Sequence, residues 1–134
     1  MTDKVFVDSN VVIYGLNSTL PQYIIARELM LQRPVISVQV VNEMINVQVR
    51  KHRRPLAAAQ EVAIFLMENC EVISLEPQDI HQAIELTRQY SLSHWDALIV
   101  ATALRAGCGI LYSEDMHHGL WVTPTLQILN PFVD

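Results

Sequence analysis

KVFVD, residues 4–8, is a short β-favouring run that ends in an acid, and the same pattern recurs along the chain. Valine and phenylalanine are enriched in strands, so residues 4–7 predict a strand. Further short apolar runs predict strands at residues 35–36, 72–75, 110–112 and 126–129. The segments between most of these runs are long enough to hold a helix, which a connection between parallel strands requires.

Those intervening segments carry apolar residues at helical spacing. Helices are expected over residues 22–32, 38–51, 55–70, 77–90 and 93–106. The segment 38–51 is ambiguous, because its valines favour a strand while Val40, Met44 and Gln48 share one helical face. We expect a helix there, with Ser37 as its N-cap. Ser93 is the expected N-cap of the last helix, and Gly107 suits its left-handed C-terminal end.

Short apolar strands that alternate with helices predict crossover connections and a mainly parallel sheet covered on both faces. The expected architecture is a three-layer α/β/α sandwich with four or five short strands. A chain of 134 residues suits one domain, so we expect residues 1–134 to form a single unit. In sheets of this kind, ligands bind in the crevice beyond the carboxyl ends of the strands.

Composition and targeting signals limit the class of protein. Apolar residues make up 51% of the chain and charged residues 17%, which is typical of a globular protein. No window approaches the length of apolar sequence that a membrane span needs, and no signal peptide is recognisable. Cys70 and Cys108 are isolated thiols without metal-type spacing, as expected in a reducing compartment. We therefore predict a cytoplasmic protein.

The net charge of −5 argues against a nucleic-acid partner, but the basic residues are concentrated. The run RKHRR at residues 50–54 contains four of the nine basic residues, namely Arg50, Lys51, Arg53 and Arg54. Two interpretations stay open at this point. The run is either a solvated helix end, where cations suit the helix dipole, or a patch that contacts backbone phosphates.

Four acids are placed where the predicted fold would bring them together. Asp8 and Asp115 follow the first and fourth predicted strands, so both should open into the same crevice. Glu43 lies more than a turn inside its helix, where no capping role is open to it. Asp96 lies in the first turn of the most apolar helix, next to Trp95, and capping is a good alternative role for it.

Other local roles exist for the remaining acids taken singly. Asp8 could start a turn, Asp115 could be a loop acid, and Glu43 could face solvent. These roles do not explain why four acids would converge at one end of one sheet. Clustered carboxylates repel one another and need a cation to stay ionised, and an all-oxygen site selects Mg²⁺ or Mn²⁺ over zinc.

The histidines and tryptophans are weaker candidates for functional residues. His94, His117 and His118 lack the paired spacing of a closed zinc site. Trp95 and Trp121 could stack on bases, but such residues more often pack against a helix or a subunit partner. We expect packing for both.

Four motifs together resemble the PIN-domain family. FVDSNVVIY at residues 6–14, the glutamate of VVNEM at 40–44, WDALIVATA at 95–103 and LYSEDMHHG at 111–119 match its successive motifs in order and context. The closing ILNPF at 128–132 resembles the ending of a bacterial subgroup. Any one motif would be weak, but the joint match extends from Val5 to Gly119.

The resemblance implies a Mg²⁺- or Mn²⁺-dependent endoribonuclease, often the toxin of a VapBC-type toxin–antitoxin pair. It makes Asp8, Glu43, Asp96 and Asp115 the metal-binding acids. Asp8 and Asp96 would bind most directly, and Glu43 is a candidate to accept a proton from the attacking water. The resemblance also assigns supporting roles to the side chains of Asn10 and Ser113. The adjacent Glu114 is the second choice for the last acid.

The implied partners are an RNA substrate, a VapB-type antitoxin and a second copy of the chain in a homodimer. The RNA target stays open, because phosphate chemistry is shared while base contacts depend on loop detail. One alternative is a module that binds an antitoxin or nucleic acid, is at most weakly catalytic, and retains the acids structurally. Another is a phosphatase of the haloacid-dehalogenase type, but Asn10 stands where that chemistry usually needs a second aspartate.

Overall fold

The computed structural model describes residues 4–133, which form a six-stranded sheet flanked by helices. The strand order is β3-β2-β1-β4-β6-β5, and every pairing is parallel except that of β5 with β6. Each strand is three or four residues long. The strands are β1(Val5–Val7), β2(Val35–Ser37), β3(Glu71–Ile73), β4(Ile110–Tyr112), β5(Trp121–Thr123) and β6(Leu126–Leu129).

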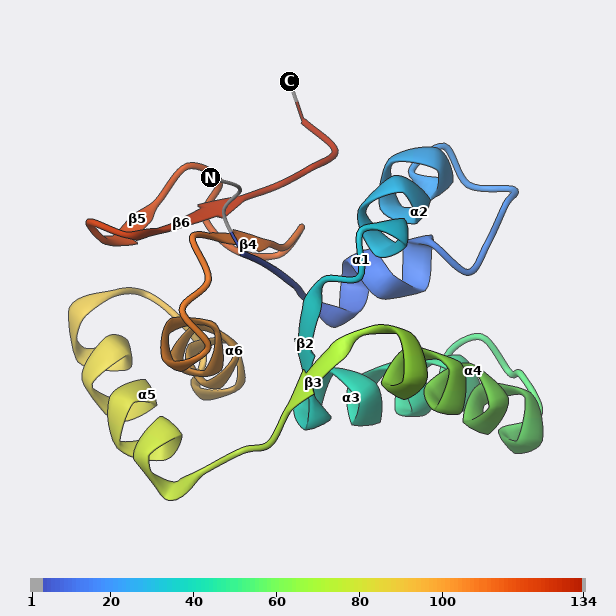
Figure 1. Cartoon of the computed structure of the whole chain (residues 1–134), viewed down its shortest axis with the longest axis horizontal. Coiled ribbons are helices and arrows are strands. Elements are labelled where there is room, and N and C mark those ends of the chain that lie inside the picture. The colour runs from blue at the N-terminus through green and yellow to red at the C-terminus, as the bar shows by residue number, and fades with distance from the viewer. Residues whose placement is uncertain (1–3, 134) are drawn as a thin grey trace.

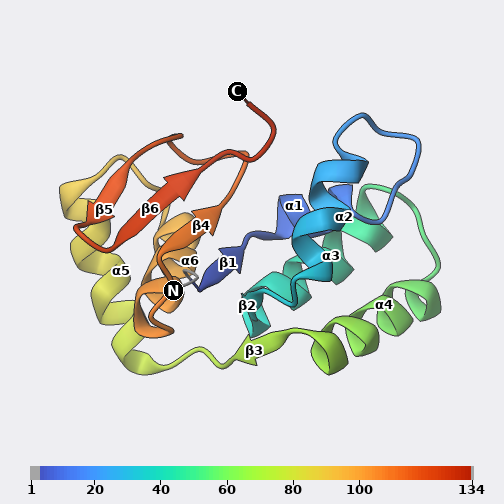
Figure 2. The same cartoon turned by 45° about the horizontal axis from the view of Figure 1, so that its top comes forward.

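The helices cover the two faces of the sheet separately. Figures 1 and 2 show α5 and α6 together on one side of the strands and α1 to α4 on the other. The helices are α1(Ser9–Tyr14), α2(Tyr23–Leu31), α3(Val38–Arg50), α4(Leu56–Asn69), α5(Pro77–Gln89) and α6(His94–Arg105). The predicted α/β/α sandwich is therefore confirmed.

The strand order places a switch point between β1 and β4. The chain moves outward from β1 through β2 to β3, and then returns past both strands to β4 on the other side of β1. Right-handed crossovers put the helices of the outward and returning paths on opposite faces. The connections that leave β1 and β4 therefore diverge, and the crevice between them is where α/β sheets bind ligands.

Two elements differ from the expectation. The sheet has six strands within the described residues, not four or five, because β5 forms a short antiparallel hairpin with β6. The ladder shifts register between Trp121 and Thr123. Helix α1 was also not expected, because its valines and isoleucine favour strands, but Asp8 caps its first turn.

The expected helix ends agree with the structure. The Ser37 Oγ accepts a hydrogen bond from the Val40 N–H at 3.3 Å, and the Ser93 Oγ accepts one from the Asp96 N–H at 3.1 Å. Gly107, just beyond α6, has a φ of +76°, a conformation that glycine adopts without strain. Among the described residues, no helix combines the length and the apolar character that crossing a membrane would require.

Helix α6 is the central helix of the core. Seven consecutive residues, from Ala97 to Ala103, are buried, because α6 contacts the sheet and also packs along α5. Thr102 is the one polar residue in this run, and its Oγ1 donates to the carbonyls of Leu98 and Ile99. A helix that is apolar all round is expected in such a buried position. The start of α6, which carries Asp96, is therefore held firmly against the sheet.

One ion pair joins α6 to α5. The Asp79 side chain is 2% exposed, and its two oxygens accept hydrogen bonds from the Arg105 Nε at 2.8 Å and Nη2 at 3.0 Å. The Arg105 Nη2 also donates to the Ser74 carbonyl. This pairing neutralises a buried carboxylate and fixes the returning connection between β3 and α6.

We predict that Arg105→Ala lowers the free energy of unfolding by about 2 kcal/mol, because it leaves Asp79 buried without its cation. Arg88→Ala is the matched control, since its partner Glu85 is exposed and such pairs contribute at most about 1 kcal/mol. Urea unfolding followed by circular dichroism measures both. Equal losses in the two variants would contradict a structural role for the buried pair.

Candidate active site

Asp8 lies at the junction of β1 and α1, at the carboxyl edge of the sheet. Its N–H donates to the Tyr112 carbonyl of β4 at 3.0 Å, which continues the pairing of the two strands. Its Oδ1 accepts from the Ser9 N–H at 2.7 Å and so caps α1. The residue is only 4% exposed. Strand pairing and helix capping therefore hold this carboxylate in one position.

Ser113 binds Asp8 from the neighbouring strand. Its N–H donates to the Leu129 carbonyl of β6 at 3.0 Å, and the residue is fully buried just beyond β4. Its Oγ donates to the Asp8 Oδ2 at 2.8 Å and accepts from the Asp115 N–H at 3.3 Å. The hydroxyl thus links the first acid to the backbone of the last one.

Asn10 connects α1 to the loop after β4. Its Nδ2 lies 3.0 Å from the Asp115 Oδ2, and it lies 3.4 Å from both the Asp8 Oδ2 and the Ser113 Oγ. Its Oδ1 accepts from the Glu114 N–H at 3.2 Å. One carboxamide therefore holds two of the predicted acids near each other.

Glu43 reaches the same region from the middle of α3. Its Oε2 accepts from the Ser9 Oγ at 2.8 Å, and its Oε1 accepts from the Gln39 Nε2 at 2.9 Å. The Gln39 Nε2 also donates to the Trp95 carbonyl at 3.1 Å, at the start of α6. Ser9 and Gln39 were not singled out in the sequence. The spacing of four residues between Gln39 and Glu43 on one helix was the only signal for the second.

The pKa values of two acids indicate that the four carboxylates interact. Burial is the main reason that the pKa of Asp8 is raised to about 6, and the charges of Glu43 and Asp96 raise it further. The hydrogen bonds from Ser113 and Ser9 act in the opposite direction and lower it. Burial also raises the pKa of half-buried Asp96, with added contributions from Asp115 and Glu43. The acids from four separate elements therefore repel one another at one edge of the sheet.

The four acids are close enough to repel one another, but their carboxylates are not close enough together to ligate one ion. Within residues 4–133, no three histidine, cysteine or acidic side chains are grouped as ligands of one ion. Coulombic repulsion acts over longer distances than ligation, so the two observations are compatible. The carboxylates are held instead by serine, asparagine and glutamine side chains. The donor set consists of oxygens, which suits a hard divalent cation.

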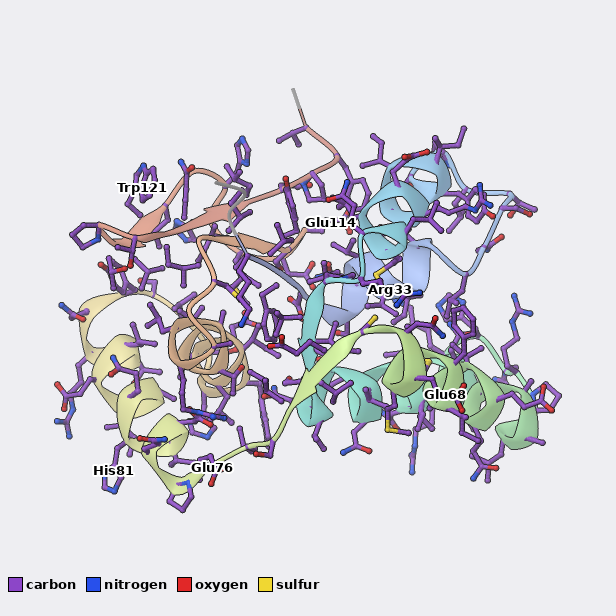
Figure 3. All side chains as sticks on the ribbon, in the orientation of Figure 1. Arg33, Glu68, Glu76, His81, Glu114 and Trp121 are labelled. Atoms are coloured by element: carbon purple, nitrogen blue, oxygen red, sulfur yellow. The ribbon has the colours of Figure 1, made fainter. Side chains whose placement is uncertain are left out.

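Glu114 is turned toward a different partner from Asp115. Its Oε1 accepts from the Tyr14 Oη at 2.7 Å, and this hydrogen bond raises the pKa of Tyr14 to about 12. Figure 3 shows Glu114 between the end of β4 and helices α1 and α2. Asp115, in contrast, shares the Asn10 amide with Asp8. This arrangement favours Asp115 over Glu114 as the last acid of the cluster.

The basic run divides into two parts in the structure. All of its side chains are exposed, and Arg50 is the last residue of α3. Lys51 and His52 line a cavity of about 300 Å³ whose wall also includes Asn10 and Asp115. Arg50, Arg53 and Arg54 do not line that cavity. Of the four predicted RNA-binding residues, only Lys51 lines the cavity beside the acids.

The tryptophans do not pack inside this chain. Trp95 is 64% exposed and Trp121 is 55% exposed. Trp95 makes an edge-to-face contact with His94, at a distance of 5.6 Å between ring centroids. The packing expected for both tryptophans would therefore require a second subunit.

The raised pKa of Asp8 predicts how stability depends on pH without metal. The unfolded chain loses the Asp8 proton near pH 4 and the folded chain near pH 6, so ionisation destabilises the fold as pH rises between these values. Asp8→Asn has no such titration. In EDTA, the stability of this variant relative to wild type should increase from pH 4 to 6, by up to roughly 3 kcal/mol. If urea unfolding gives wild type and Asp8→Asn the same dependence of stability on pH, the raised pKa of Asp8 is contradicted.

Several solved structures share the fold of this chain. A toxin–antitoxin complex from Klebsiella pneumoniae is 20% identical, with a TM-score of 0.72 over 96% of this chain and 98% of that chain. VapC20 from Mycobacterium tuberculosis, described as a sarcin-ricin loop cleaving toxin, is 22% identical, with a TM-score of 0.68 over 84% and 92%. DNA-bound VapBC from Salmonella typhimurium is 15% identical, with a TM-score of 0.69 over 95% and 97%.

The sequence itself also matches a known family. The family model described as PIN domain matches residues 5–118, which is most of the chain and includes all four predicted acids. No curated protein sequence gives a significant match. The resemblance inferred from the four sequence motifs is confirmed, and this chain belongs to the PIN domain family.

Proposed function

We propose that this chain is a Mg²⁺- or Mn²⁺-dependent endoribonuclease that hydrolyses phosphodiester bonds in RNA, and that it is the toxin of a toxin–antitoxin pair. The observation that carries the proposal is the convergence of Asp8, Glu43, Asp96 and Asp115 at the switch point of the sheet. Their burial and mutual repulsion support a bound cation, because several carboxylates in a partly buried site stay ionised only with a positive charge nearby.

Asp8 and Asp96 are the residues that would hold the metal most directly, with Glu43 and Asp115 completing its surroundings. A bound Mg²⁺ or Mn²⁺ supplies a more acidic water and a positive charge beside the scissile phosphate. Ser113 and Asn10 orient Asp8 and Asp115 through the hydrogen bonds described above. Glu43 is our candidate for accepting the proton of the attacking water.

Ser9 and Gln39 support that role of Glu43. Together they donate one hydrogen bond to each of its two carboxylate oxygens, so the side chain cannot swing freely into solvent. A proton acceptor must be held within hydrogen-bond reach of the water that it deprotonates.

Two features support RNA and an antitoxin as the macromolecular partners. The chain belongs to the PIN domain family, and one of its structural neighbours is described as a toxin that cleaves the sarcin-ricin loop. Other neighbours are described as toxin–antitoxin or VapBC complexes. Membership of this family also removes the support for the phosphatase alternative. A homodimer stays a prediction, and the exposed Trp95 and the α5 residues Ile80 and Ile84 are candidate contacts.

An apolar groove between α2 and α4 is the surface that we assign to the antitoxin. It encloses about 450 Å³ and is lined by residues of α1, α2 and α4, including Met30, Leu31 and Phe65. Leu31 and Phe65 are each 63% exposed in the same groove, and contiguous exposed apolar surface is typical of a protein–protein contact. Arg27 and Arg33 also line this groove and would favour a partner segment that carries acids.

We expect Asp8→Asn or Asp96→Asn to lower Mn²⁺-dependent cleavage of RNA by roughly 100-fold or more, because each removes a charged ligand. Both variants should also lose the rise in melting temperature that Mn²⁺ gives the wild type. Glu68→Gln, which alters an exposed acid of α4 away from the site, is the control and should behave like wild type (Figure 3). A wild-type protein with neither cleavage nor a Mn²⁺ shift would favour the non-catalytic binding module.

The groove assignment has its own matched pair of variants. Phe65→Asp places a charge in the groove and should abolish co-purification with a co-expressed antitoxin. Ile64→Asp, on the next residue of α4, is 53% exposed before substitution and does not line the groove, so binding should persist. Equal retention of the antitoxin by both variants would place its binding site elsewhere.

A further inference from the structure

The cavity beside the acids has three chemically different parts. Its volume is about 300 Å³, and Ser9, Asn10 and Asp115 of the acidic site form one part of its lining. Lys51 and His52 form a second part. The apolar side chains of Ile13, Leu20 and Val47, all half-buried, form the third. A ligand with an anionic group and a flat apolar body fits this combination of surfaces.

One stripe of residues along α3 and its C-cap leads from the acidic site to the cavity. Glu43, Val47 and Lys51 are spaced four apart, so they lie above one another along the helix. Glu43 binds Ser9 within the acidic site, while Val47 and Lys51 line the cavity. From Glu43 to Lys51 the helix rises about 12 Å, which a short stretch of single-stranded RNA can cover. The acids and the cation are therefore arranged along one path.

We propose that this cavity is a nucleotide subsite of the proposed nuclease. It takes the base and sugar of a nucleotide beside the scissile phosphate on the apolar floor around Val47, and Lys51 contacts the backbone phosphate that follows. The inference rests on the proposed function and adds the direction in which the substrate leaves the acids. It separates Lys51 from Arg53 and Arg54, which belong to the same run but not to the cavity.

Glu114 gives the subsite a preference among bases. It lines the cavity, and the Tyr14 hydroxyl holds it in place through a hydrogen bond to Oε1. A carboxylate has about four acceptor positions, so this bond leaves capacity for another donor. The exocyclic N4 amine of cytosine can donate to a carboxylate, whereas uracil presents a carbonyl oxygen at the same position. The subsite therefore favours cytosine over uracil.

The first test compares binding with cleavage prevented. Fluorescein-labelled single-stranded oligocytidylate is titrated with full-length protein in EDTA at low salt, and anisotropy gives the affinity. Lys51→Ala should weaken binding five- to tenfold and reduce the log–log salt slope by about 0.7, as expected for one phosphate contact. Arg54→Ala removes the same charge outside the cavity and should weaken binding no more than about twofold. Equal losses would overturn the subsite.

The second test fills the apolar floor. Val47→Phe should weaken binding about tenfold without changing the salt slope, while Val49→Phe, a half-buried valine of α3 outside the cavity, should bind as wild type does. Equal affinities of these two variants would show that the base does not bind in this cavity, and a protein partner would then be its better candidate ligand. Lys51 is exposed, so Lys51→Ala still tests the subsite through its phosphate contact even if Val47→Phe fails to fold.

The third test addresses the base preference. Wild type should bind oligocytidylate about tenfold more tightly than oligouridylate, and Glu114→Gln should reduce that ratio toward one. A wild-type ratio near one, or a ratio unchanged in the variant, would overturn the role of Glu114. None of these measurements requires metal, so they can fail while Mn²⁺-dependent cleavage is observed, and the reverse also holds. Failure of the subsite is thus distinguishable from failure of the proposed function.

Discussion

The burial of Asp8 beside other carboxylates at the switch point is the constraint on which the rest of the site depends. Its charge is costly in this buried position without a cation, and Glu43 and Asp96 add to that cost. The surrounding structure holds the acids at fixed positions despite this cost. Ser113 and Asn10 do so for Asp8, while Ser9 and Gln39 do so for Glu43.

The fold supplies the rigidity that this arrangement needs. Helix α6 is buried for seven consecutive residues, and the pair of Asp79 with Arg105 ties it to α5. The start of α6 carries Asp96, so the burial of the helix fixes the position of that acid. The predicted capping role of Ser93 and the proposed metal-binding role of Asp96 are compatible, because a capped first turn keeps the carboxylate still.

Much of the fold could be predicted from the sequence because the signals were local. The short strands, the five longer helices and the caps at Ser37 and Ser93 follow from periodicity and from residue type at helix ends. Helix α1 was missed because VVIY at residues 11–14 favours a strand, whereas the structure closes a short helix with the Asp8 cap. Strand β5 was missed because it pairs with β6 in a short antiparallel hairpin, without the helix that separates the other strands.

The sequence by itself determined which strand and helix ends carry acids, and therefore that Asp8 and Asp115 open at one edge of the sheet. Only the tertiary structure decided which neighbours hold these acids. The bonds from Ser9 to Glu43 and from Asn10 to Asp115 join residues 34 and 105 positions apart. No local pattern encodes such contacts, because they exist only once the crossovers have placed α1, α3 and the loop after β4 side by side.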